Sequence, residues 1–105
     1  MNLYANIRPI KTFAGTKRPL GDVELVCVRE ATEGLYSGIE HRLSNDVAIA
    51  FRKISRQQSE KVARTAFEEA KRRGWSRAFA ITKQNILKET DGLFMEAVRS
   101  IHRNY

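Results

Sequence analysis

The amino-acid sequence predicts a small α/β domain with short strands, two amphipathic helices and a projecting β-hairpin arm. Two stretches with apolar residues at helical spacing alternate with short apolar runs that are typical of strands, and this alternation favours an α/β layer. The length of 105 residues, with 42% hydrophobic content, suits one domain with a modest core. We therefore expect residues 1–105 to form a single domain.

The start of the chain is predicted to be extended. Residues 3–20 contain Pro9 and Pro19, which predict an extended loop rather than a regular element. Residues 23–28 form an apolar run that predicts a short buried strand. Cys27 lies in this run and is the only cysteine of the chain, so we expect a buried, inert thiol.

A hairpin arm is predicted over residues 36–54. Two extended runs flank the polar turn of residues 44–46, and the second run, residues 47–51, has one apolar face. A small domain cannot easily cover such an arm by itself, so we expect a dimer.

Two helices are predicted in the second half of the chain. Ser55 and Gln58 predict a capping box at the first helix, and Gly74 predicts its end. Residues 78–81 then predict a second short strand, and a polar turn precedes a last helix from about Asp91. The apolar stripes are Val62, Ala63, Ala66, Phe67 and Ala70 in the first helix, and Leu93, Phe94, Ala97, Val98 and Ile101 in the second.

Charge and composition narrow the possible functions. The formal charge of +7, from 19 Lys and Arg against 12 Asp and Glu, favours an anionic partner without choosing its class. The densest basic run, residues 71–73, closes the first predicted helix, where cations stabilise the carbonyl end, so we predict no nucleic-acid binding. His41 and His102 belong to no Cys/His cluster, which argues against zinc. Without a membrane-spanning run or signal pattern, we expect a soluble, cytoplasmic protein.

Four motifs, in order along the chain, carry a resemblance to a known family. They are residues 3–9 (LYANIRP), 28–41 (VREATEGLYSGIEH), 82–87 (TKQNIL) and 91–94 (DGLF). Together they resemble the isocitrate and isopropylmalate dehydrogenases, over essentially residues 3–104. The sequence of the second motif is closer to the isocitrate and homoisocitrate branches than to the isopropylmalate enzymes. The resemblance implies that the chain is a fragment of that fold, covering its central substrate-binding and dimerisation region.

Three arginines are the residues that the resemblance assigns to substrate binding. It implies that Arg8, Arg18 and Arg29 grip the carboxylates of a 2-hydroxy di- or tricarboxylic acid. Guanidinium groups bind carboxylates bidentately and stay charged at any working pH, which suits a small polycarboxylic acid. Without the resemblance, each arginine would be interpreted as an ordinary surface charge.

Proton-transfer and cofactor roles are implied for three more residues. Tyr36 corresponds to the tyrosine that returns a proton to the enol left after decarboxylation, and Lys83 to the lysine that assists removal of the hydroxyl proton. Asn85 corresponds to a residue near the nicotinamide ribose. Two departures from the family pattern, Ala31 and Gln84, stand where asparagine and a small residue are usual, and Gln84 could crowd the approach to Asn85.

The family's cofactors are NAD or NADP and a divalent metal, Mg or Mn. Hydride transfer to the nicotinamide oxidises the alcohol, and the metal polarises the new carbonyl so that carbon dioxide leaves. The family's metal-binding aspartates and its nucleotide-binding segment correspond to no part of this chain, so no metal ligand is assigned in it. We expect the chain to be inactive alone and to need a complementing subunit or the missing segments.

Two other function classes stay open. The chain could be a non-catalytic dimerisation or regulatory module derived from the same family, using its arm and helices. It could also be a basic nucleic-acid binder, whose binding would depend steeply on salt.

Overall fold

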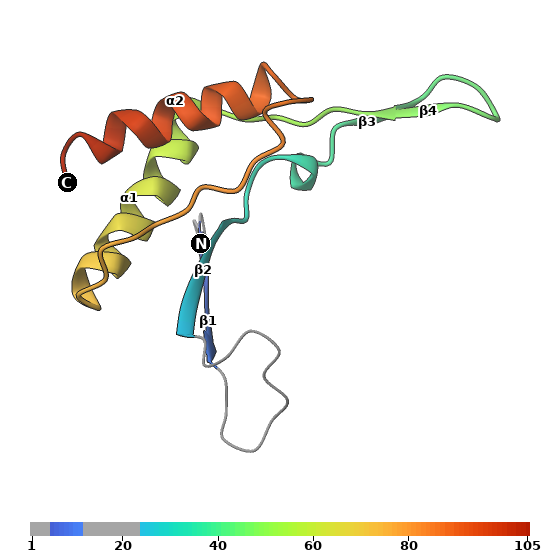
Figure 1. Cartoon of the computed structure of the whole chain (residues 1–105). Coiled ribbons are helices and arrows are strands. Elements are labelled where there is room, and N and C mark those ends of the chain that lie inside the picture. Colours follow the sequence, from blue (N-terminus) through green and yellow to red (C-terminus); the bar gives the residue numbers. More distant parts are fainter. Residues whose placement is uncertain (1–4, 12–23) are drawn as a thin grey trace.

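A pair of helices, a two-stranded ribbon and a long hairpin make up the fold. The computed structural model describes residues 5–11 and 24–105. The elements are the strands β1 (Ala5–Lys11) and β2 (Glu24–Glu30), the 3-10 helix η1 (Leu35–Ser37), the strands β3 (Glu40–Arg42) and β4 (Ala48–Ala50), and the helices α1 (Arg56–Arg72) and α2 (Thr90–His102). In Figure 1 the β3–β4 hairpin extends far from the helices as an arm. This arrangement confirms the predicted α/β class with two helices and a projecting hairpin.

The first strand was not expected from the sequence. The interpretation of residues 3–20 as a loop is wrong over Ala5–Lys11, because these residues pair with β2 along its whole length in an antiparallel ribbon. Pro9 lies opposite Val26 within this pairing. Proline lacks the N–H that a central strand needs, but it is tolerated in an edge strand, and both strands of a two-stranded ribbon are edges.

The second strand is confirmed, but it is only partly covered. On β2 the side chains of Val26, Val28 and Glu30 are half-buried, and this strand packs against α1. The residues that alternate with them are exposed, and Cys27 is among these. The prediction of a buried strand and a buried thiol is therefore wrong, because successive side chains of a strand point to opposite faces and α1 covers only one.

The arm is held by a short ladder and a polar turn. The N–H of Phe51 donates to the carbonyl of Ile39 at 2.8 Å, and that of Leu43 donates to the carbonyl of Val47, also at 2.8 Å. At the tip, the hydroxyl of Ser44 accepts hydrogen bonds from the backbone of residues 46 and 47. The predicted hairpin and its turn are confirmed.

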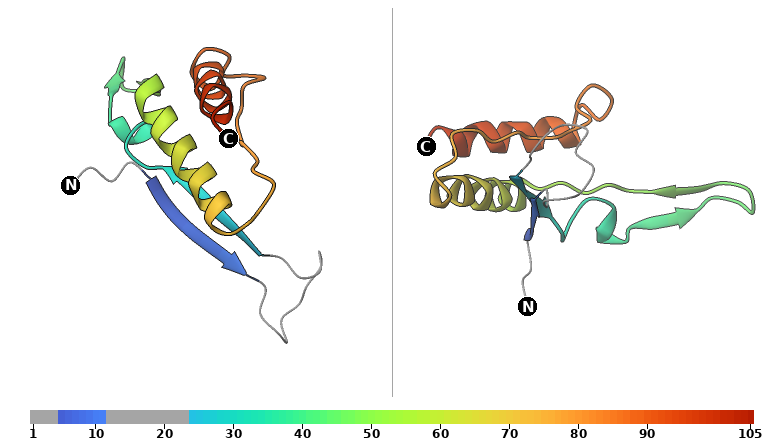
Figure 2. Two further views of the ribbon diagram at one scale, coloured as in Figure 1. Left: turned by 90° about the vertical axis from the view of Figure 1, so that its left-hand side faces the viewer. Right: turned by 60° about the horizontal axis from the view of Figure 1, so that its bottom comes forward.

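The core lies between α1 and α2, which pack against each other and lie side by side in the right view of Figure 2. Its buried apolar side chains in the described part of the chain are Val62, Ala63, Ala97 and Ile101. The rings of Phe67 and Tyr105 stack at 5.4 Å and extend this core towards the C-terminus. The predicted apolar stripes of both helices thus meet each other, as expected for amphipathic helices.

Both ends of α1 follow the sequence prediction. The hydroxyl of Ser55 accepts a hydrogen bond from the N–H of Gln58, which is the N-cap half of the predicted capping box. Gly74 adopts a positive φ of 70°, a conformation that favours glycine, just after the helix ends. Lys71 and Arg72 lie in the last turn of the helix, as predicted, and Arg72 and Arg73 pair with Glu69.

The stretch between the helices contains no strand. Residues 78–81 were predicted to form one, and this is wrong, since no strand of the described residues pairs with them. Phe79 is 83% exposed and Ile81 is 92% exposed, so the apolar pattern has no cover within this part of the chain.

Among the residues described, no helix has the length and apolar character that crossing a membrane requires.

Candidate functional site

The exposed face of the β1–β2 ribbon brings two predicted arginines together. In the antiparallel register, Arg8 lies opposite Cys27 and Asn6 lies opposite Arg29. Paired residues project from the same face, and side chains two residues apart in a strand share a face, so these four side chains lie on one face. It is the face turned away from α1, because the residues that alternate with them on β2 are the half-buried ones. Arg8 donates from Nε to the side-chain oxygen of Asn6 at 3.1 Å.

Tyr36 completes this group. An Nη2 hydrogen of Arg29 is donated to the Tyr36 phenol oxygen at 2.5 Å, and the guanidinium carbon lies 5.3 Å from the centre of the ring. Tyr36 is carried by η1, which is flanked by Gly34 and Gly38 with φ of 72° and 70°. Because such angles favour glycine, these two residues allow the tight turn that places the phenol beside the guanidinium. We refer to Arg8, Arg29 and Tyr36 together as the arginine face.

A buried carboxylate ties the arginine face to α1. Glu33 is 8% exposed and accepts hydrogen bonds from the backbone N–H and the hydroxyl of Ser55, both at 2.7 Å. Its neighbour Gly34 exchanges two backbone hydrogen bonds with Lys53, of 2.7 and 3.3 Å. A buried carboxylate is costly unless it is hydrogen-bonded, so these contacts define the position of the segment between β2 and η1. Sequence reasoning missed Glu33, since nothing local to it indicates a partner 22 residues away.

Lys83 and Asn85 lie in a separate turn before α2. The Lys83 carbonyl accepts from the N–H of Ile86 at 2.9 Å and of Leu87 at 2.7 Å. The N–H of Lys83 donates to a carboxylate oxygen of Asp91 at 2.6 Å. Both Lys83 and Asn85 are exposed, so the predicted polar turn is present with both side chains open to solvent.

One copy of the chain does not bring all predicted residues together. In Figures 1 and 2, η1 and the turn before α2 lie on opposite sides of the root of the arm. Among the described residues, no hydrogen bond or ion pair joins Lys83 or Asn85 to the arginine face. Arg18 lies outside the described residues. The structure therefore gathers Arg8, Arg29 and Tyr36, and holds Lys83 and Asn85 apart from them.

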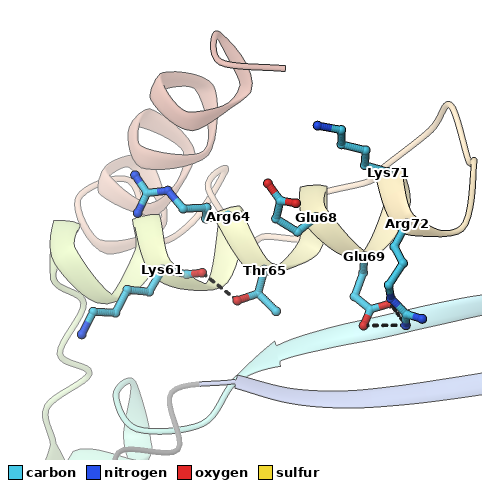
Figure 3. A pocket seen from close by; sticks show the side chains of 7 residues that line it. All are labelled: Lys61, Arg64, Thr65, Glu68, Glu69, Lys71 and Arg72. Carbon is cyan, nitrogen blue, oxygen red and sulfur yellow. Dashed lines mark hydrogen bonds and ion pairs between the residues drawn. The ribbon is translucent and has the colours of Figure 1, made fainter.

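Two surface hollows on the described part of the chain lie away from these residues. One of about 790 Å³ follows α1 and is shown in Figure 3, lined by Lys61, Arg64, Thr65, Glu68, Glu69, Lys71 and Arg72. Hydrogen bonds from Arg72, and then from Arg73, hold the pKa of the Glu69 carboxyl below its usual value. Another hollow, of about 380 Å³, lies at the start of α2. None of the predicted site residues lines either one.

Comparison with known proteins identifies the family. The family model described as isocitrate/isopropylmalate dehydrogenase matches residues 1–105, the whole chain. The chain belongs to the isocitrate/isopropylmalate dehydrogenase family. It is 45% identical over 105 residues to a chloroplastic 3-isopropylmalate dehydrogenase of Solanum tuberosum. It is also 45% identical over 105 residues to the mitochondrial isocitrate dehydrogenase [NAD] catalytic subunit 5 of Arabidopsis thaliana.

A solved structure of this dehydrogenase family has the same fold. The isocitrate dehydrogenase from Methylococcus capsulatus matches 99% of the chain with a TM-score of 0.93 and 45% identity. The chain covers 32% of that protein, and 29% and 28% of the potato and Arabidopsis relatives. It is therefore a fragment of the isocitrate/isopropylmalate dehydrogenase fold that spans less than a third of these relatives.

Proposed function

We propose that the chain is the central portion of an NAD(P)-dependent β-decarboxylating dehydrogenase for isocitrate or a related 2-hydroxy polycarboxylic acid, and that it is inactive by itself. The observation that carries this proposal is the arginine face, where Arg8, Arg29 and Tyr36 share one exposed surface. Arg8 and Arg29 project from the same face of the ribbon at diagonal positions of the register, an arrangement suited to an acid with two or more carboxylates. Arg18 is proposed as a third carboxylate ligand.

The contact between Arg29 and Tyr36 is suited to proton transfer at this surface. The guanidinium donates to the phenol oxygen, so the phenol O–H is free to point towards a substrate held on the same face. A carboxylate bound by Arg29 would therefore place the adjoining carbons next to a proton donor. This geometry supports Tyr36 as the group that protonates the enol after decarboxylation.

Within one copy of the chain, Lys83 and Asn85 lie apart from the arginine face, so a complete site needs a second chain. Since their turn lies across the root of the arm from η1, we propose that a second copy or a complementing subunit brings a lysine to the arginine face. The exposed apolar residues of the arm support such an association, and they include Ile39, Leu43, Val47 and Phe51. Several relatives are themselves named as subunits, among them the isocitrate dehydrogenase [NAD] subunit alpha of Bos taurus, 41% identical over 103 residues.

The cofactors are proposed for the whole enzyme rather than for this chain alone. NAD is named in the isocitrate dehydrogenase relatives, and NADP is the other nicotinamide nucleotide that fits the chemistry. The residues described here contain no group of three or more His, Cys, Asp or Glu side chains that could hold a metal ion. We propose that the Mg or Mn of the whole enzyme binds through residues that are not part of this chain.

Calorimetric titration with isocitrate and magnesium tests the proposal. Arg29→Ala should weaken binding about tenfold or more, because a charged hydrogen bond contributes about 1.5–3 kcal/mol. Arg64→Ala, which removes an exposed arginine from α1, is the matched control and should change binding less than twofold. Equal affinity of the parent and Arg29→Ala would overturn the proposal. A parallel titration with isopropylmalate shows which of the two acids the chain binds more tightly.

A second candidate function is a non-catalytic dimerisation or regulatory module. The exposed apolar arm favours it, because association would cover the arm whether or not an acid binds. Light scattering distinguishes the two functions when it is combined with the titration. A stable dimer that binds no hydroxy acid would support the module and exclude the proposed substrate-binding role of the chain.

A further inference from the structure

Asp91 is a buried carboxylate in the first turn of α2. The residue is 3% exposed, and its two carboxylate oxygens accept from different segments of the chain. Oδ2 accepts from the backbone N–H of Lys83 at 2.6 Å, and Oδ1 is paired with the Arg52 guanidinium. Arg52 also donates to the hydroxyl of Thr90 at 3.1 Å. The Arg52 side chain is 35% exposed, whereas Asp91 is buried, and a buried carboxylate is costly unless its oxygens are hydrogen-bonded, so Asp91 should hold both segments.

The two segments that Asp91 joins have different places in the fold. Arg52 stands two residues after β4, at the root of the arm. Lys83 begins the turn before α2, and its carbonyl closes that turn through the N–H groups of residues 86 and 87. Figure 1 shows the chain that returns from β4 passing the first turn of α2. One carboxylate therefore links the root of the arm to the turn that carries Lys83.

We propose that Asp91 is a positioning residue that, together with Arg52, sets the place of the Lys83 turn relative to the arm. Backbone hydrogen bonds close the turn itself, and among the described side chains the Asp91 carboxylate is the one that binds the backbone N–H of Lys83, which is exposed. The importance of that location for catalysis rests on the proposed function of Lys83. A partner that binds the arm would act on Lys83 through Arg52 and Asp91.

A simpler role for Asp91 makes different predictions. An acidic residue in the first turn of any helix stabilises that helix through its dipole, by about 0.3–1 kcal/mol. In that role, replacement of Arg52, which lies outside α2, would not change the hydrogen exchange of the Lys83 amide. It would also leave the Lys83 N–H no more protected from exchange than its neighbours. Arg52 and the Lys83 amide therefore distinguish positioning from simple helix stabilisation.

Hydrogen exchange of backbone amides in the 105-residue chain, followed by NMR, is the test. In the unchanged chain, the Lys83 amide should exchange at least about tenfold more slowly than the Asn85 amide, because only Lys83 donates to a buried carboxylate. Equal exchange rates at these two amides would overturn the proposal, and this comparison needs no variant to fold.

Two variants and one control extend the test to the arm. Asp91→Asn and Arg52→Met should each speed exchange of the Lys83 amide by about tenfold or more. Arg56→Met is the control, since it breaks the exposed Arg56–Glu96 pair of 2.9 Å that also reaches α2. It should change the Lys83 rate less than twofold. Equal acceleration in all three variants, or none in Arg52→Met, would overturn the link to the arm.

The outcome is separable from that of the proposed function. Asp91→Asn should leave isocitrate binding within twofold of the parent, because the arginine face lies on the other side of the arm root. If the parent chain itself binds no acid, the proposed function fails, and the exchange data still decide whether Asp91 positions Lys83.

Discussion

Ser55 joins two parts of the molecule, and its replacement by alanine has a consequence that can be calculated. Its hydroxyl accepts from the N–H of Gln58 at 3.3 Å as the N-cap of α1, and donates to Glu33 at 2.7 Å. Ser55→Ala removes both hydrogen bonds. The backbone N–H of residue 55 still donates to the second oxygen of Glu33 at 2.7 Å, so that the carboxylate keeps one partner.

The expected loss of stability has two parts. An N-cap serine contributes about 1 kcal/mol, and the 3.3 Å distance places this one at the lower end of the range of about 0.5–2 kcal/mol. A hydrogen bond to a charged group contributes about 1.5–3 kcal/mol, and the 8% exposure of Glu33 limits replacement by water. The sum is a decrease of about 2–4 kcal/mol in the free energy of unfolding. Small domains have about 5–15 kcal/mol in total, so this loss is large.

Urea unfolding followed by far-UV circular dichroism measures this loss. Ser76→Ala, at an exposed serine between the helices, is the control and should cost less than about 0.5 kcal/mol. A double-mutant cycle with Glu33→Gln should show a coupling of about 0.5–3 kcal/mol between residues 33 and 55. A loss in Ser55→Ala as small as that of the control would refute the reasoning.

Three further predictions follow from the core, the C-terminus and the arm. Ile101→Ala should cost about 2–5 kcal/mol and Ile101→Val about 0.5–1.5 kcal/mol in the same urea assay, because Ile101 is buried between the helices. The Tyr105 phenol donates to Glu68, which raises the pKa of Tyr105. The stability from this contact is therefore present below about pH 10 and is lost as the pH rises through the raised pKa, and melting curves of Tyr105→Phe should lack this alkaline decrease. Phe51→Glu should shift the light-scattering mass towards the monomer, because Phe51 is 55% exposed on the arm.

The helices and the hairpin were predictable because their signals are local. Ser55 and Gln58 are three residues apart, and the apolar stripe of α1 repeats within one segment. Such patterns need no knowledge of the rest of the fold. The turn at residues 44–46 is equally local, because the hydroxyl of Ser44 bonds to the backbone just beyond it.

The strands were less predictable, because strands need partners that a local pattern does not name. Pro9 suggested a loop, yet it lies in an edge strand where its missing N–H costs little. Residues 78–81 have the composition of a strand but find no partner among the described residues. Cys27 stands between two valines, and only the alternation of faces, together with cover on one side alone, decides that it is exposed.

The residues of the candidate site were predicted, but their arrangement in space was not. The resemblance named Arg8, Arg29 and Tyr36, and the register together with one hydrogen bond brings them to a single face. Glu33 and Asp91 were not predicted as positioning groups, since their partners are defined by the folded chain. The separation of Lys83 from the arginine face depends on the place of the arm, which no sequence pattern shows. Cytoplasmic location and the absence of nucleic-acid binding stay predictions.

The most direct test of the account follows the arginine side chains while an acid is added. In the ¹⁵N-labelled chain, the Nε–H signals of Arg8 and Arg29 should shift together and saturate at one isocitrate concentration, because both lie on the arginine face. The signals of Arg64 and Arg99, on the two helices, should stay in place. If none of these signals moves, or if all four move alike, the arginine face does not bind a polycarboxylic acid.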